Sequence, residues 1–129
     1  MKRRTAREKA LQALFSIDMS KVEVSSAIEH VLEGKKEDDF LNELVYGVVR
    51  HQEEIDAKIS PLLEKWTLDR LSYVDRNILR IAAYELIFGD KEIPVNVILD
   101  EAIEVAKVFG DDNSSKFVNG LLSKLKNQL

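Results

Sequence analysis

The sequence predicts an all-α fold of seven helical segments, one of which is a central apolar helix with the other six packed around it. Apolar residues recur at helical spacing through most of the 129 residues. The chain has only two prolines and five glycines, and most of them lie between the periodic segments. The segment Ser72–Phe88 is apolar nearly all round, and such a helix must be enclosed by others. A length of 129 residues with 45% hydrophobic residues fits one domain with a sizeable core.

The first predicted helix runs from Thr5 to about Ser20. Its inward stripe consists of small and aliphatic residues, namely Ala6, Ala10, Ala13, Leu14 and Ile17. Arg4, Arg7, Leu11 and Phe15 recur every three or four residues and share one flank. This flank combines cations with an aromatic ring, the pair that single-stranded RNA needs for its phosphates and bases. The same residues also fit a solvated basic end with Phe15 at the rim of the core.

Two further helices are predicted before residue 52. The first spans Val22–Glu33, and the second begins at Asp38 or Asp39, with an apolar face formed by Phe40, Leu41, Leu44, Val45, Val48 and Val49. Gly47 lies inside the second helix, where glycine costs about 1 kcal/mol relative to alanine. We therefore expect another helix to pack closely against Gly47.

The apolar pattern resumes at Ile55 and continues to Trp66. Pro61 is expected to interrupt this helix because proline lacks the backbone N–H. Trp66 continues the pattern and is predicted to be a buried anchor, after which Leu68–Leu71 links to the central helix.

The central helix has recognisable ends. Ser72 is a suitable N-cap with Asp75 three residues later, and Gly89 follows the last apolar residue. Glu85 falls inside the apolar arc and needs a partner, for which we expect Arg80 or a backbone amide. This predicts a structural carboxylate rather than a catalytic one.

Two more helices complete the pattern. Pro94 precedes a helix over Val95–Phe109, and a last helix begins at Asp112 or Asn113 with the core face Val118, Leu121, Leu122 and Leu125. Phe117 lies at the edge of that face beside Asn113, Gly120 and Lys124. It is a second aromatic residue with polar neighbours, and a half-buried core position explains it equally well.

The charge is unevenly distributed. The chain carries a net charge of −4, but residues 1–17 hold five basic residues and one acidic residue, whereas residues 22–56 hold three and ten. The absence of cysteine excludes disulfides and thiol catalysis, and no apolar run is long enough to span a membrane or serve as a signal core. We expect a cytoplasmic protein without a cofactor or metal, because no nucleophile constellation, metal-ligand spacing or phosphate-binding glycine loop is present.

Four segments together resemble the NusB family of bacterial transcription antitermination factors: RRTAREKALQALF, VDRNILRIAAYEL, IPVNVILDEAIEVAKVFG and SSKFVNGLL. They occur in the family's order and spacing, and the resemblance as a whole extends over nearly the whole chain. The resemblance implies two packed three-helix-type subdomains, about residues 1–52 and about residues 53–129, within a single domain.

The resemblance also implies a function without catalysis. Members of this family bind single-stranded boxA RNA together with NusE, a ribosomal small-subunit protein, and join NusA and NusG on elongating RNA polymerase, notably in ribosomal RNA operons. By position, the implied RNA-binding residues are Lys2, Arg3, Arg4, Arg7, Phe15, Asn113, Lys116 and Phe117. Asp75 matches an acidic position associated with NusE. The family often has tyrosine where this chain has Phe15, so stacking is kept but a hydroxyl hydrogen bond is not.

Two other functions remain open at this point. The chain could be the detached RNA-binding part of a ribosomal RNA cytosine methyltransferase, although it has no glycine-rich turn for S-adenosylmethionine and no catalytic cysteine. It could also be an RNA-independent protein-interaction bundle, in which the basic first helix docks on an acidic partner. Either a monomer or a homodimer is compatible with the sequence.

Overall fold

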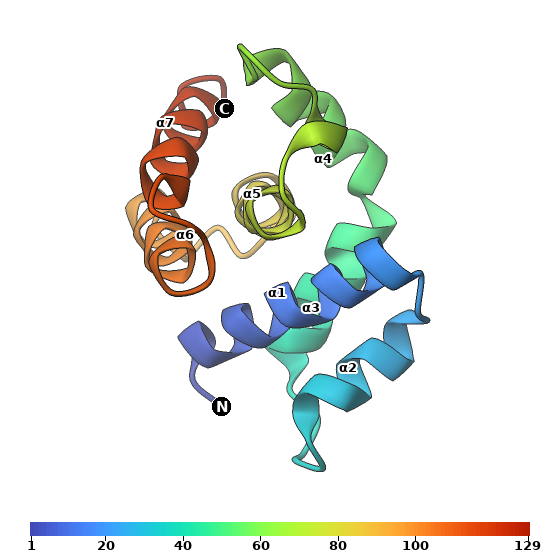
Figure 1. The fold of residues 1–129 in the computed structure, drawn as a ribbon. Coiled ribbons are helices and arrows are strands. Elements are labelled where there is room, and N and C mark those ends of the chain that lie inside the picture. The colour runs from blue at the N-terminus through green and yellow to red at the C-terminus, as the bar shows by residue number, and fades with distance from the viewer.

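The computed structural model describes residues 1–129 and consists of helices without strands (Figure 1). The seven α-helices are α1 (Arg3–Ser20), α2 (Val24–Leu32), α3 (Asp39–Arg50), α4 (Gln52–Ile59), α5 (Tyr73–Phe88), α6 (Val95–Phe109) and α7 (Ser114–Lys126). Two 3₁₀ helices, η1 (Ser60–Leu62) and η2 (Leu68–Arg70), lie between α4 and α5. The predicted all-α class is confirmed. None of the helices has both the length and the apolarity that crossing a lipid bilayer requires.

Helix α5 is the centre of the molecule. Figure 1 shows it end-on, with the other helices around it, and every residue from Arg76 to Leu86 is buried. Its first turn is capped as predicted, because the Ser72 hydroxyl accepts the backbone N–H of Asp75 at 3.0 Å. The helix ends at Phe88, directly before Gly89.

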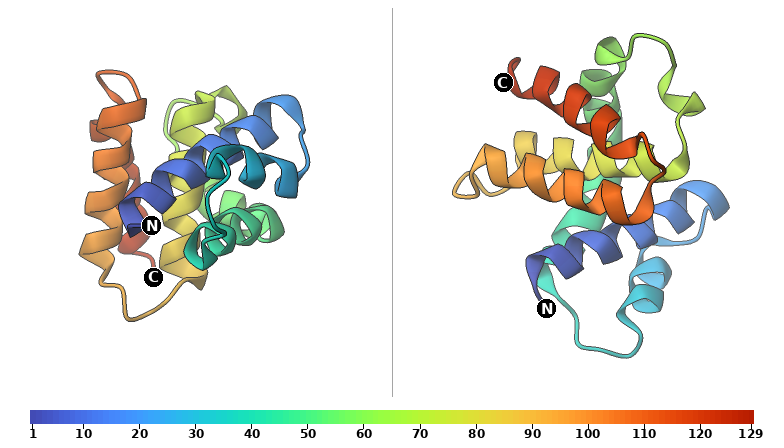
Figure 2. Two further views of the ribbon diagram at one scale, coloured as in Figure 1. Left: turned by 90° about the horizontal axis from the view of Figure 1, so that it is seen from below. Right: turned by 60° about the vertical axis from the view of Figure 1, so that its left-hand side comes forward.

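The other helices pack on two sides of α5. Both views in Figure 2 show α6 and α7 on one side and α2 with α3 on the other. Helices α1 and α3 contact α5 directly, as do α4, α6 and α7. A single core cluster of 32 buried residues includes residues from all seven α-helices. The helices on both sides of α5 therefore share one core, and the division near residue 52 stays a prediction.

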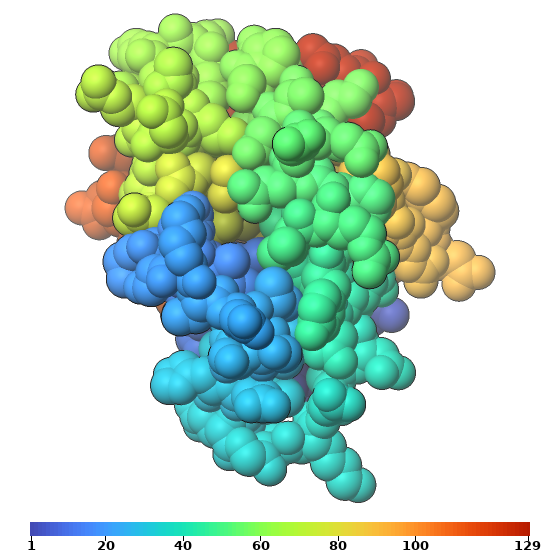
Figure 3. Space-filling model, turned by 90° about the vertical axis from the view of Figure 1, so that its right-hand side faces the viewer, coloured from blue at the N-terminus to red at the C-terminus, as the bar shows by residue number.

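One face of the molecule is formed by helices from both the N-terminal and the C-terminal parts of the chain (Figure 3). Figure 3 shows α1 and α2 (blue to cyan) in the lower half of this face and residues of α4, η1 and η2 (green to yellow-green) above them.

Gly47 allows two helices to come close together. A Cβ atom at this position would overlap the ring of Tyr84 on α5. The expected close helix contact is thus confirmed, and its partner is the central helix.

The region around Pro61 confirms one expectation and corrects another. Helix α4 ends at Ile59 and the chain continues through the 3₁₀ turn that contains Pro61, so the interruption is confirmed. Trp66 is 58% exposed, and its prediction as a buried anchor was wrong. Helical spacing predicts burial only within a continuous helix, and the chain is no longer helical between Leu62 and Trp66.

Glu85 is buried with a partner that the sequence did not indicate. Its carboxylate accepts two hydrogen bonds from Arg7 of α1, at 2.9 and 2.8 Å, and both side chains are about 95% buried. Arg80 instead donates to Asp56 at 2.9 Å and to Asp18 at 3.3 Å. These ion pairs connect α1, through Arg7 and Asp18, and α4, through Asp56, to the central helix.

Candidate nucleic-acid interface

Phe15 lies half-buried on α1 beside the start of α5. Its ring packs edge-on against Tyr73, with 5.7 Å between the ring centroids. It also lines a surface hollow of about 360 Å³ together with His30, Val74 and Phe109. Tyr73 therefore fixes the position of the Phe15 ring, while the side chain stays accessible from the hollow.

Phe117 is the second half-buried ring, and it lies on the first turns of α7. Asn113 is the N-terminal flanking residue of this helix, and its side chain makes no capping hydrogen bond. The backbone N–H of Asn113 instead donates to the Asp111 carboxylate at 2.8 Å. The Asn113 amide and the exposed Lys116 amine are thus free to contact a ligand near Phe117.

The N-terminal turn of α5 connects the two aromatic positions. Tyr73 contacts Phe15, and two residues later Asp75 lies close to Ser114 and Asp111 at the start of α7. Phe117 follows Ser114 by one helical turn. The structure therefore brings together Phe15, Asp75, Asn113, Lys116 and Phe117 on one region, which we call the α5 N-terminal face.

The Asp75 carboxyl has an unusual environment on this face. Burial raises its pKa, and the nearby Asp111 carboxylate adds to the effect, while the hydroxyls of Ser114 and Ser72 partly offset it. One carboxyl oxygen of Asp75 is enclosed without a hydrogen-bond partner. A charged Asp75 is thus less stable in the folded chain than in water.

This environment predicts the effect of Asp75→Asn. Because the pKa of Asp75 is higher in the folded than in the unfolded chain, the folded state binds the proton more tightly, and stability falls as pH rises from the unfolded value of about 3.9 through the folded one. An uncharged amide at this position does not suffer that loss. We expect a higher free energy of unfolding at pH 7, by less than about 1 kcal/mol because solvent screens a half-exposed group.

Urea unfolding at several pH values between about 4.5 and 7, all above the unfolded carboxyl pKa of about 3.9, measures this gain. The difference between the variant and the original chain should grow with pH. Asp112→Asn, at an exposed position nearby, should show no such trend. A constant difference, or a less stable Asp75→Asn variant at pH 7, would contradict the assigned cause.

The N-terminal cations lie away from this face. Arg3 precedes Phe15 by twelve residues, which is roughly 18 Å along a helix. The guanidinium of Arg3 lies 4.6 Å from the centre of the Phe40 ring. Arg4 forms two hydrogen bonds to Glu101 of α6, at 2.8 and 3.1 Å, and these lower the pKa of Glu101. Lys2 is exposed and makes no ion pair.

Arg7 is not available as a surface cation. It is only 5% exposed, and its guanidinium already donates two hydrogen bonds to Glu85. The flank formed by Arg4, Arg7, Leu11 and Phe15 is therefore not a continuous solvent-facing stripe, because Arg7 and Leu11 are enclosed by the core. Helical spacing showed correctly that these residues share a side of α1 but could not show that the middle of that side is covered.

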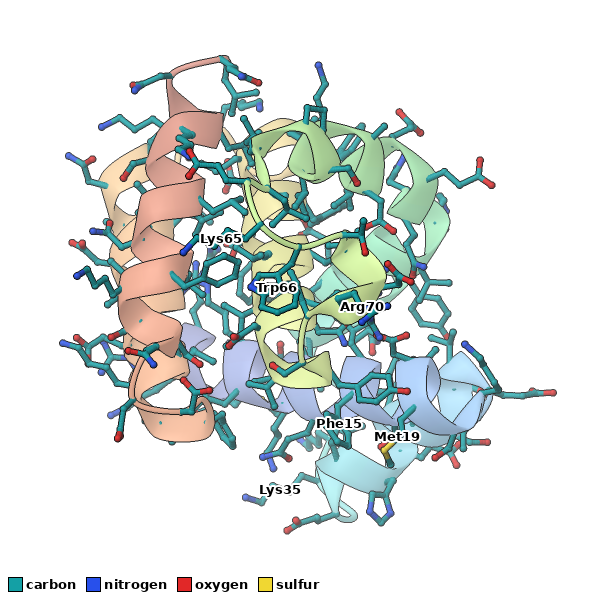
Figure 4. The ribbon with its side chains drawn as sticks, turned by 45° about the horizontal axis from the view of Figure 1, so that its top comes forward. Phe15, Met19, Lys35, Lys65, Trp66 and Arg70 are labelled. Atoms are coloured by element: carbon teal, nitrogen blue, oxygen red, sulfur yellow. The ribbon has the colours of Figure 1, made fainter.

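The sequence placed Lys124 beside Phe117 but did not indicate that Lys65 and Trp66 lie there as well. All three residues line the same groove as Phe117 and Lys116. Figure 4 shows Trp66 and Phe15 on the same side of the molecule, with Lys65 beside α7. The sequence did contain a signal for an exposed binding residue here, because Lys65 and Trp66 are adjacent and follow the helix-breaking Pro61.

A helical bundle that offers half-exposed rings, amide groups and lysine amines on one face is typical of a binding protein. Comparison with known proteins makes this specific. The model of the NusB family matches residues 4–127, and the chain belongs to this family, whose members are transcription antitermination factors and not enzymes.

Relatives and solved structures agree with this assignment. The chain is 58% identical to the transcription antitermination protein NusB of Bacillus velezensis and 57% identical to that of Bacillus subtilis, covering 100% of this chain and 98% of each relative. It is also similar to the structure of T. maritima NusB, with a TM-score of 0.90 and 39% identity over 99% of this chain and 92% of that chain. A further similar structure, with a TM-score of 0.87 and 34% identity, contains the antitermination factors NusB and NusE in complex with dsRNA, and the match covers 98% of this chain and 97% of that one.

Proposed function

We propose that this protein binds single-stranded boxA RNA of ribosomal RNA operon leaders together with NusE, and acts with NusA and NusG on elongating RNA polymerase in the cytoplasm. The observation that carries the proposal is the α5 N-terminal face, where rings from opposite ends of the chain flank one helix terminus. A similar chain in complex with NusE and double-stranded RNA supports RNA and NusE as the partners.

The side chains on this face suit an unpaired strand better than a duplex. Phe15 and Phe117 can each stack a base, and stacking requires bases that are not already enclosed in a helix. The Asn113 amide can donate to and accept from a base edge, which would give sequence preference. Lys116 supplies attraction to phosphates close to these bases. We keep Lys2 and Arg3 as proposed phosphate contacts farther along the strand, and Asp75 as a proposed NusE contact.

We propose that NusE completes the RNA site. The chain has a net charge of −4, and several of its cations are already paired, including Arg4 with Glu101 and Arg7 with Glu85. The attraction for RNA phosphates is therefore modest for the isolated chain, and a basic partner would strengthen it.

A salt titration tests this proposal. Fluorescence anisotropy should measure the affinity for labelled boxA RNA at several salt concentrations, with and without NusE, beside a scrambled strand and a boxA duplex. If three lysines or arginines contact phosphates, the logarithm of the affinity should fall with the logarithm of salt with a slope of roughly −2 for the chain alone. We expect NusE to raise the affinity and steepen this slope.

The controls separate the alternatives. Equal affinity with and without NusE would contradict completion of the site by NusE. Equal binding of boxA and scrambled RNA would contradict sequence preference, and a preference for the duplex would contradict the role of stacking. An RNA-independent interaction bundle would bind none of the three RNAs.

A further inference from the structure

A groove runs between the end of η1 and helix α7, and we call it the Trp66 groove. One wall consists of residues 62–66 and the other of residues on the exposed side of α7 between Lys116 and Lys124. Its volume is about 270 Å³. Trp66 and Phe117 both line it, so two aromatic side chains from segments far apart in the sequence border the same space.

Trp66 has no role in the packing of the isolated chain that accounts for its position. It is 58% exposed, which is unusual because tryptophan is highly buried on average. It is also not among the aromatic side chains that contact one another, unlike Phe15 and Tyr73. An exposed tryptophan beside a groove is a typical stacking surface for a base.

Gly120 gives an independent indication that something outside the chain occupies this groove. It lies in the middle of α7, where glycine weakens the helix relative to alanine. A Cβ atom at Gly120 would meet nothing within 4 Å, whereas one at Gly47 would overlap Tyr84. Packing within the folded chain therefore explains Gly47 but not Gly120. Glycine is also used where a ligand approaches the backbone closely, and Gly120 lines the groove one turn after Phe117.

The charge of the groove indicates an anionic occupant. Lys65, Lys116 and Lys124 line it together with one acid, Glu64. Lys124 and Glu64 pair with each other at 2.7 Å across the groove, which leaves the amines of Lys65 and Lys116 uncompensated. Aromatic surfaces beside two free amines match a nucleotide strand, with bases on the rings and phosphates on the lysines.

We propose that the Trp66 groove binds an additional nucleotide of the RNA strand, stacked on Trp66 and next to the one at Phe117. The inference rests on the proposed RNA-binding function and extends the α5 N-terminal face to residues 63–66 and Gly120. The strand then passes over an open helix surface at Gly120, which any side chain at this position would obstruct.

The chain contains a single tryptophan, so its own tryptophan fluorescence comes from Trp66 alone, and a NusE sample measured alone gives the background. Titration of the NusE complex with single-stranded boxA RNA should quench this fluorescence and reduce its accessibility to acrylamide. Trp66→Ala should weaken binding by about 5- to 150-fold, the range expected for loss of one stacked base. Trp66→Phe should recover part of that loss.

Gly120→Gln gives a test that does not alter the tryptophan. Glutamine is a better helix former than glycine, so the variant should unfold at a higher urea concentration while binding RNA less tightly. Asn119→Gln, at the neighbouring exposed position on α7, is the matched control and should bind RNA as the original chain does.

The outcomes distinguish this inference from the function on which it rests. If Phe117→Leu weakens RNA binding while Trp66→Ala and Gly120→Gln do not, and fluorescence stays unchanged, the inference is overturned and the proposed function stands. If Trp66→Ala lowers only the affinity for NusE, the groove is a protein contact and the inference is overturned as well. If the original chain with NusE binds none of the RNAs, the proposed function itself fails.

Discussion

Replacing Arg7 with methionine is expected to lower the free energy of unfolding by about 3–5 kcal/mol, because it leaves a buried charge without its partner. Glu85 is 4% exposed, and Arg7 alone supplies its two hydrogen bonds, at 2.9 and 2.8 Å. Urea unfolding followed by far-ultraviolet circular dichroism measures the change. The pair connects α1 to the last turn of α5, so the loss affects the contact between these two helices.

A double variant separates a buried charge from lost packing. Arg7→Met combined with Glu85→Leu removes both charges and keeps apolar volume at the site, and it should recover most of the stability that Arg7→Met loses. Arg4→Met is the control, because Arg4 forms the same kind of pair with Glu101 but its side chain is 55% exposed. We expect a much smaller loss of stability for Arg4→Met, because solvent screens that exposed pair.

The difference in stability between Arg7→Met and Arg4→Met also shows whether an effect of Arg7→Met on RNA binding is direct or comes from unfolding. Arg7→Met would reduce RNA binding only to the extent that it unfolds the chain, and the double variant should bind RNA normally. An Arg7→Met variant as stable as Arg4→Met, yet unable to bind RNA, would contradict the structural role of Arg7.

Replacing Phe15 or Phe117 with leucine is expected to weaken boxA RNA binding by about 1–3 kcal/mol for each ring, because a stacked base is lost. Leucine keeps the apolar volume that the half-buried rings provide to the core but has no aromatic face. Phe15→Tyr keeps that face and should retain binding. Fluorescence anisotropy with NusE present measures the affinities.

Phe88→Leu is a suitable control for these variants. Phe88 is also half-buried, but it stacks on His51 with 4.0 Å between the ring centroids, at the C-terminal end of α5. The substitution should leave RNA affinity unchanged. If all three leucine variants bind equally well, or if Phe88→Leu weakens binding as much as the others, the α5 N-terminal face is not the RNA site.

The helices could be predicted from the sequence because the signals that determine them are local. Helical spacing and the Pro94 start gave Val95–Phe109 without error, and Ser72 caps the central helix as its position predicts. Gly47 indicated a close helix contact, although not its partner Tyr84. Each of these depends on residues within a few positions along the chain.

Contacts between distant segments could not be predicted in this way. Glu85 needed a partner, but Arg7 lies 78 residues earlier, and only the packing of α1 on α5 brings the two together. Trp66 was misplaced because helical spacing was extended past the turn at Pro61. Helical spacing predicted that Phe15 and Phe117 lie at the edges of apolar stripes and that Lys124 lies beside Phe117, whereas the approach of Lys65 and Trp66 to the same groove depends on the fold.

Backbone amide chemical shifts during titration with single-stranded boxA RNA locate the bound strand without any substitution. If RNA binds the α5 N-terminal face, the largest shifts should belong to residues around Phe15, residues 73–75 and residues 113–117. Shifts confined to α2, α3 or the outer surface of α6 would contradict this assignment, because RNA would then bind away from the N-terminal end of α5.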